Sequence, residues 1–60
     1  MEMRLINNFV EEWGHENENT IAFIDWLARH PNASTLQEIA AFNVFRRKAI
    51  VELNAINNEP

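Results

Sequence analysis

The sequence predicts an all-α protein, a small bundle of three helices that forms a single domain over residues 1–60. Three observations support this prediction. Apolar residues recur at helical spacing along most of the chain. Gly14 and Pro31 stand where the first two helical patterns end. A well-marked capping box begins at Ser34 and opens the last helical region.

The first helix is expected over residues 2–13. Its apolar side chains fall within about half of the helix circumference and polar residues lie opposite them. Gly14 fits the end of this helix, because glycine adopts a left-handed cap without strain. The polar run over residues 15–19 is then expected to be a loop. The apolar positions of the helix are Met3, Leu5, Ile6, Phe9, Val10 and Trp13.

The second helix is expected from about Thr20 to His30. Asn17 or Asn19 is suited to cap its start, and Pro31 stops it. The apolar arc covers about 220° of the circumference, which is wide for a surface helix. This helix is therefore expected to be central in the bundle or to contact a second chain. Its apolar positions are Ile21, Phe23, Ile24, Trp26, Leu27 and Ala28.

The last helical region, residues 34–57, has an apolar pattern that changes phase in the middle. Its two stripes lie roughly 130° apart on a straight helix. Either the helix breaks near Asn43, giving four short helices and a helix–turn–helix, or one long helix serves two surfaces. The sequence leaves both alternatives open. The stripes consist of Leu36, Ile39 and Ala40, and of Phe45, Ala49, Leu53 and Ile56.

The predicted core draws on all three helical regions. A chain of this length buries only about 60% of its unfolded surface and is marginal alone. It has no cysteine, so neither disulfides nor thiolate metal sites support it. Its six aromatic residues supply more apolar surface than a lone bundle is expected to hide. We therefore expect a homodimer, formed through the last helix and the wide arc of the second. The predicted core is Ile6, Phe9, Trp13, Ile24, Leu27, Ile39, Ala49 and Leu53.

The net charge of −4 is unevenly distributed along the chain. Residues 1–25 carry six acidic residues against Arg4 alone, whereas residues 26–60 carry four basic residues against three acidic ones. The acidic half argues against charge-driven binding of nucleic acid over the whole surface. No apolar run approaches the length of a membrane span, and the N-terminus lacks the features of a signal peptide. We expect a cytoplasmic protein without membrane contact.

The basic triplet Arg46, Arg47 and Lys48 is the candidate nucleic-acid contact. In a helix–turn–helix protein the second helix enters the major groove with its first residues on bases or phosphates. Residues 36–48 resemble that motif in their acidic and apolar opening, their turn residue and the basic residues that follow. DNA is therefore one possible partner.

The same stretch departs from the motif in two ways. The distance from Ala40 to the turn residue Asn43 is one residue too short, and Phe45 stands where a small cap is expected. The alternative is a solvent-exposed basic turn of a long helix, with Lys48 paired to Glu52 four residues later.

Four apolar residues are the candidate interface: Phe23, Trp26, Phe45 and Ile56. Large aromatic side chains dominate the energetics of protein interfaces. The alternative for each aromatic residue is ordinary core filling. We expect at least one of them to lie between subunits.

No catalytic motif is present, and we expect neither an enzyme nor a bound cofactor or metal. The chain has a single glycine, so it cannot form a glycine-rich phosphate-binding loop. His15 and His30 have no neighbouring ligand set for zinc. Acid–base catalysis would need a desolvated pocket, which so short a chain has little room to build. The remaining glutamates are expected to form an exposed acidic face, or an acidic surface for a partner: Glu11, Glu12, Glu16 and Glu18.

The whole chain resembles a known group of proteins, from the opening MEMRLINNFVEEWGHENENTIAFIDWLARHP to the basic segment FRRKAIVELNAINNE. These are the tiny early proteins of lambdoid bacteriophages from the exo–xis region, between the recombination exonuclease and the excisionase. The resemblance implies an intracellular phage product, without enzymatic activity, that biases the lysis–lysogeny decision or host physiology. It does not say whether the target is DNA or protein.

We therefore expect a non-enzymatic regulatory protein that acts on a host or phage regulatory protein through protein–protein contacts. The alternative is a dimeric helix–turn–helix DNA-binding regulator that uses residues 46–48.

Overall fold

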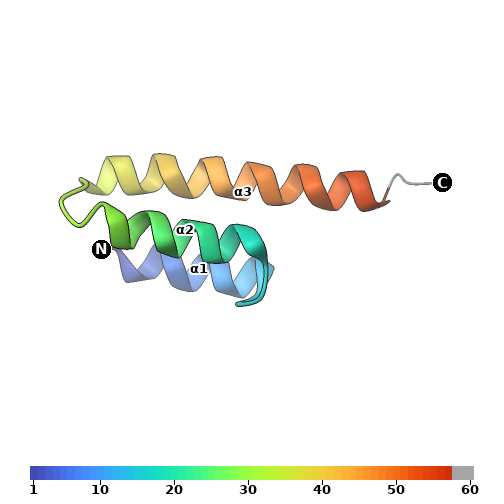
Figure 1. The fold of residues 1–60 in the computed structure, drawn as a ribbon, viewed down its shortest axis with the longest axis horizontal. Helices are drawn as coiled ribbons and strands as arrows, with labels where there is room; N and C mark the ends of the chain where they lie inside the picture. Colours follow the sequence, from blue (N-terminus) through green and yellow to red (C-terminus); the bar gives the residue numbers. More distant parts are fainter. Residues whose placement is uncertain (58–60) are drawn as a thin grey trace.

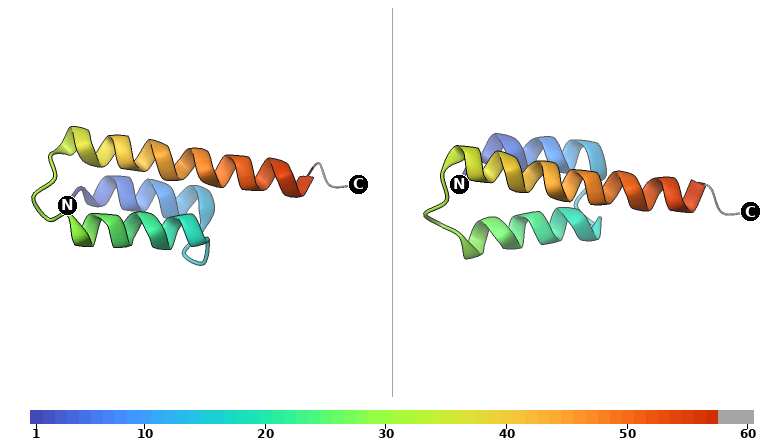
Figure 2. Two further views of the ribbon diagram at one scale, coloured as in Figure 1. Left: turned by 45° about the horizontal axis from the view of Figure 1, so that its top comes forward. Right: turned by 90° about the horizontal axis from the view of Figure 1, so that it is seen from above.

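The computed structural model describes residues 1–57 as three α-helices (Figure 1). These are α1 (Met3–Trp13), α2 (Glu18–Arg29) and α3 (Thr35–Asn57). Each helix packs against the other two, and α3 lies over both α1 and α2 (Figure 2). The described part of the chain is therefore an all-α three-helix bundle, which confirms the predicted fold class.

Short capping contacts explain where the helices begin and end. Gly14 ends α1 as predicted, and its N–H donates to Val10 O at 2.7 Å. Its φ of 83° is positive, but its ψ of 164° lies outside the left-handed helical region, so the cap is not the left-handed one expected. Asn17 caps α2, since its Oδ1 accepts a hydrogen bond from the backbone N–H of Asn19 at 2.8 Å. The capping box before α3 is also present, because Ser34 and Gln37 exchange side-chain to backbone hydrogen bonds of 2.8 and 3.2 Å.

The helix does not break near Asn43. One helix runs without interruption from Thr35 to Asn57, so the fourth helix and the turn required for a helix–turn–helix over residues 36–48 are not formed. No glycine or proline lies between residues 35 and 57 to force a break in the backbone hydrogen bonds, so Asn43 can remain inside the helix while α3 packs against α1 and α2. The other alternative holds, and a single long helix presents its apolar stripes in different directions.

Aromatic rings form the centre of the core, where all three helices meet. Phe9 of α1 stacks on Phe23 of α2 with ring centroids 5.4 Å apart. Phe42 of α3 meets both rings edge-on, at 5.6 and 5.7 Å. Such pairs contribute about 0.5–1.5 kcal/mol each beyond the area that they bury. Leu27 and Ala41 complete the buried cluster.

The predicted core is confirmed in part. Phe9, Leu27 and Ala49 are buried, whereas Ile6, Trp13 and Ile24 are only partly buried. The remaining predictions, Ile39 and Leu53, are wrong, since their side chains are 39% and 46% exposed. Ile39 is exposed because the face of α3 that packs on the bundle passes through Glu38, Ala41 and Phe45 instead. Leu53 lies on that face but beyond the last buried residue of α3, Ala49.

The aromatic residues are less exposed than the sequence predicts. Two of them are fully buried, and the other four are partly buried and pack against the core cluster. The apolar surface that the monomer leaves uncovered is instead aliphatic or methionine. Its exposed members are Met1, Met3, Ile21, Leu36, Ile39, Val44, Val51, Leu53 and Ile56.

Candidate functional site

The basic triplet of α3 does not form one patch. Arg46 points toward α1, where its Nε and Nη2 donate to the two carboxylate oxygens of Glu12 at 2.7 and 3.2 Å. These hydrogen bonds lower the pKa of Glu12 and raise the pKa of Arg46. Arg47 and Lys48 point elsewhere, because successive residues of a helix are 100° apart. Arg46 is thus part of the bundle, and only the other two cations remain for a partner.

Neither Arg47 nor Lys48 forms an ion pair within residues 1–57. The Lys48 ammonium lies over the Phe45 ring, with its Nζ 5.4 Å from the ring centroid. The predicted pair between Lys48 and Glu52 is absent. Glu52 instead accepts a hydrogen bond of 3.0 Å from the side-chain amide of Asn19, a buried residue of α2.

A second carboxylate lies close to Glu52. Glu18, in the first turn of α2, has a raised pKa, because its protonated carboxyl would hydrogen-bond to Glu52 and because the two negative charges repel each other. This pair of acids sits where α2 begins and where the buried part of α3 ends. It forms a polar boundary between the bundle and the C-terminal part of α3.

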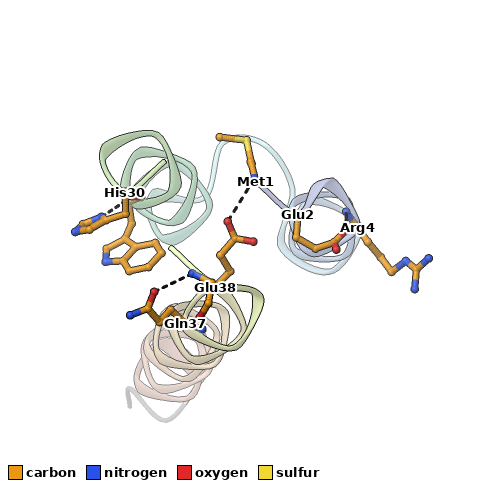
Figure 3. Close-up of polar contacts among 8 residues, drawn as sticks. Met1, Glu2, Arg4, His30, Gln37 and Glu38 are labelled. Atoms are coloured by element: carbon orange, nitrogen blue, oxygen red, sulfur yellow. Dashed lines mark hydrogen bonds and ion pairs between the residues drawn. The ribbon is translucent and has the colours of Figure 1, made fainter. Parts of the chain in front are cut away.

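A groove between the end of α2 and the first half of α3 forms an apolar recess on the described surface. Its volume is about 670 Å³. At its α2 end, the His30 ring stacks on Trp26 at 4.3 Å, and His30 Nδ1 lies 2.8 Å from Trp26 O (Figure 3). No carboxylate residue of the described chain lines the groove. We call it the α2/α3 groove, and its main lining residues are Trp26, His30, Ala33, Ala40, Val44 and Phe45.

A second recess adjoins this groove on the same helix. It has a volume of about 490 Å³, and Val44 lines both recesses. Arg47, Lys48 and Val51 line the second recess together with Asn43 and Glu52. Because Val44 lines both recesses, they form one continuous surface along α3 from Gln37 to Val51, which we call the track. Its side chains are mainly apolar, and it also contains the unpaired cations Arg47 and Lys48.

The C-terminal part of α3 extends past the other two helices (Figures 1 and 2). Every residue from Val51 to Asn57 is exposed, and we call this segment the overhang. Leu53 and Ile56 continue the stripe of Phe45 and Ala49, yet Ile56 is 67% exposed because nothing in the described chain covers it. Glu52 is the only charged residue of the overhang.

The predicted interface residues fall into three different environments. Phe23 has no exposed surface, because it stacks inside the ring cluster, so it is a core residue and not an interface residue. Trp26 and Phe45 are partly buried and line the α2/α3 groove, and Ile56 lies on the overhang.

Sequence reasoning missed Val44 and Val51, which are exposed on the track. Their spacing of seven residues places them on one side of α3, and this was the signal that would have found them.

A buried acid lies at the opposite end of α3. The Glu38 side chain is almost fully buried, and its Oε2 lies 3.6 Å from the amino group of Met1 (Figure 3). A carboxylate that is removed from water requires a partner of opposite charge, so this contact ties the start of the chain to the start of α3. It lies at the end of α3 opposite to the overhang.

The described residues contain no group of three or more histidine, cysteine or acidic side chains placed to hold a metal ion. None of the three helices is both long enough and apolar enough to cross a bilayer. The chain matches no protein-family model, no curated protein and no solved structure.

Proposed function

We propose that this chain is a small non-enzymatic regulatory protein that works through protein–protein contacts made by α3, in the cytoplasm of a host cell. The observation that carries the proposal is the overhang, because an apolar stripe that packs inside the bundle continues there without cover. Exposed apolar residues scattered singly are ordinary, whereas a continuing stripe is typical of an interaction surface. The resemblance to the early phage proteins of the exo–xis region favours the same class of function.

A second copy of the chain is the partner that the overhang fits most simply. Leu53 and Ile56 of two copies could cover one another if the two α3 helices crossed in antiparallel orientation around a twofold axis. With Glu52 as its only charge, the overhang brings little like-charge repulsion to such a pairing. So short a contact buries less surface than a standard interface, and we expect a dissociation constant in the micromolar range.

Sedimentation at tens of micromolar protein tests the dimer. We expect a species of twice 7.0 kDa that the double change Leu53→Lys/Ile56→Lys converts to monomer. Leu36→Lys is the matched control, since Leu36 is 79% exposed at the other end of α3 and should leave the dimer intact. A wild-type protein that sediments only at 7.0 kDa under these conditions would contradict self-association.

The DNA alternative can be tested separately. It is weakened by the unbroken helix and by the engagement of Arg46 with Glu12, but Arg47 and Lys48 remain unpaired within residues 1–57. A gel-shift assay against phage and host DNA at two salt concentrations should show no salt-sensitive complex at micromolar protein. A complex that weakens steeply with salt and is lost in Arg47→Ala/Lys48→Ala would favour the DNA-binding function instead.

A further inference from the structure

We propose that the α2/α3 groove, together with Arg47 and Lys48 beside it, binds an acidic amphipathic helix of a partner protein. This inference rests on the proposed function, because it names the chemistry of the partner that α3 contacts. The groove residues that carry it do not include Leu53 or Ile56, on which the dimer depends, so the two proposals can fail independently.

The shape and lining of the track favour a helix. Trp26 and Phe45 form its base as partly buried aromatic side chains, and Val44 stands at its centre with 53% of its surface exposed. A helix that docks in such a groove inserts apolar residues at every third or fourth position. The track from Gln37 to Val51 is roughly 21 Å long, which matches about four turns of a partner helix.

The positive charge of the track favours acidic residues on the polar side of a partner helix. Arg47 and Lys48 lack a carboxylate partner within residues 1–57, and no Asp or Glu of that region lines the groove itself. Glu52 is the acid nearest to them on the track, and it is held by the amide of Asn19. The track is therefore basic on a chain whose net charge is −4, and complementary charge would favour and orient an acidic helix.

The same observations argue against nucleic acid as the occupant. Two unpaired cations offer few phosphate contacts, and affinity for DNA depends on the number of phosphates that are neutralised. An apolar recess of about 670 Å³ contributes nothing to phosphate binding, whereas it accommodates leucine or phenylalanine side chains.

Designed peptides test the inference directly. Helical peptides of about 16 residues would share one leucine stripe and carry glutamate, lysine or glutamine on their flanks. The protein would be the full chain with Trp13→Phe, so that Trp26 in the groove is the only tryptophan and reports binding by its fluorescence. Circular dichroism would show that this conservative change leaves the fold intact.

We expect the glutamate peptide to bind about tenfold more tightly than the glutamine peptide, and the lysine peptide to bind least. The double change Arg47→Glu/Lys48→Glu should reverse this order. Val44→Gln should weaken binding of the glutamate peptide by about tenfold, whereas Leu36→Gln, at a more exposed position outside the groove, should leave its affinity unchanged.

Several results would overturn the inference. These are no binding of the glutamate peptide at about 100 µM, equal affinity for the three peptides, or tighter binding of duplex DNA than of any peptide. A dimer that Val44→Gln dissociates, and that survives Leu53→Lys/Ile56→Lys, would place a second copy of the chain in the groove. If the wild-type protein binds the glutamate peptide but does not dimerise, only the proposed self-association is overturned.

Discussion

The two parts of α3 have similar apolar content but opposite surroundings. From Glu38 to Ala49 the helix lies against α1 and α2, and its inward side chains are buried or half-buried. In the overhang the same stripe continues through Leu53 and Ile56, but both residues are exposed. The apolar pattern of a helix therefore shows which of its faces is suited to packing. The lengths of the neighbouring helices determine how much of that face is buried within the chain.

The strongest test of this comparison removes one large side chain from the core beneath the packed part of α3 and one from the overhang. Phe23→Ala would leave a cavity in the ring cluster against which α3 packs, and should cost about 3–5 kcal/mol of unfolding free energy. A chain of this size has only a few kcal/mol of total stability, so we expect this variant to be largely unfolded by circular dichroism. Leu53→Ala should cost well under about 1 kcal/mol in the monomer, measured by urea unfolding at low protein concentration. Equal losses would mean that the overhang is packed in solution.

Removal of a buried hydroxyl group near the start of α2 should increase the free energy of unfolding. The Thr20 side chain is fully buried, and its Oγ1 has no hydrogen-bond partner within residues 1–57. Thr20→Val replaces the hydroxyl with a methyl group of similar shape, and should stabilise the fold by about 1 kcal/mol in urea unfolding. Thr35→Val, at the exposed first residue of α3, is the control and should not stabilise it. Destabilisation by Thr20→Val would show that the hydroxyl is paired.

The contact between Arg46 and Glu12 should give a smaller, pH-dependent effect. Because the hydrogen bond from Arg46 holds the pKa of Glu12 below its usual value, this contact stabilises the fold at neutral pH. That stability is lost as the pH falls through the lowered pKa of Glu12. Arg46→Gln should lower the urea midpoint slightly at pH 7 and not at pH 2, since half-exposed pairs contribute little. An equal decrease at both pH values would show that the Arg46 stem acts by packing alone.

The acidic pair at the boundary should respond to pH in the opposite direction. Glu52 raises the pKa of Glu18, so the fold is stabilised below the ordinary pKa of a glutamate and loses that stability as the pH rises through the raised value. Glu18→Gln removes the repulsion and should raise the urea midpoint at pH 7 but not at pH 3. Glu16→Gln, in the preceding loop, is the matched control. A midpoint that does not change at pH 7 would mean that the two acids do not interact in solution.

Local signals in the sequence predicted most of the fold. Gly14, Pro31 and the capping box at Ser34 determine backbone geometry within a few residues, and each helix boundary that depends on them was correct to within two residues. The continuity of α3 could not be decided in this way. Asn43 is compatible with both a helix interior and a cap, and packing against α1 and α2 decides between them.

The candidate site was less predictable for a geometric reason. Adjacent residues in the sequence diverge on a helix, so Arg46 joins α1 while Arg47 and Lys48 face outward. The partner of Arg46 is 34 residues away, and only the tertiary packing shows that Glu12 meets it. The groove is likewise formed by two helices together, and periodicity within one helix does not reveal a recess that its neighbour completes.

The unbroken course of α3 has a mechanical consequence. A rigid rod of 23 residues cannot turn at one end and stay fixed at the other, so any rolling of the helix at the groove would reorient Leu53 and Ile56 by the same angle. The contact between Arg46 and Glu12 lies along α3 between the groove and the overhang, and such rolling would have to break it.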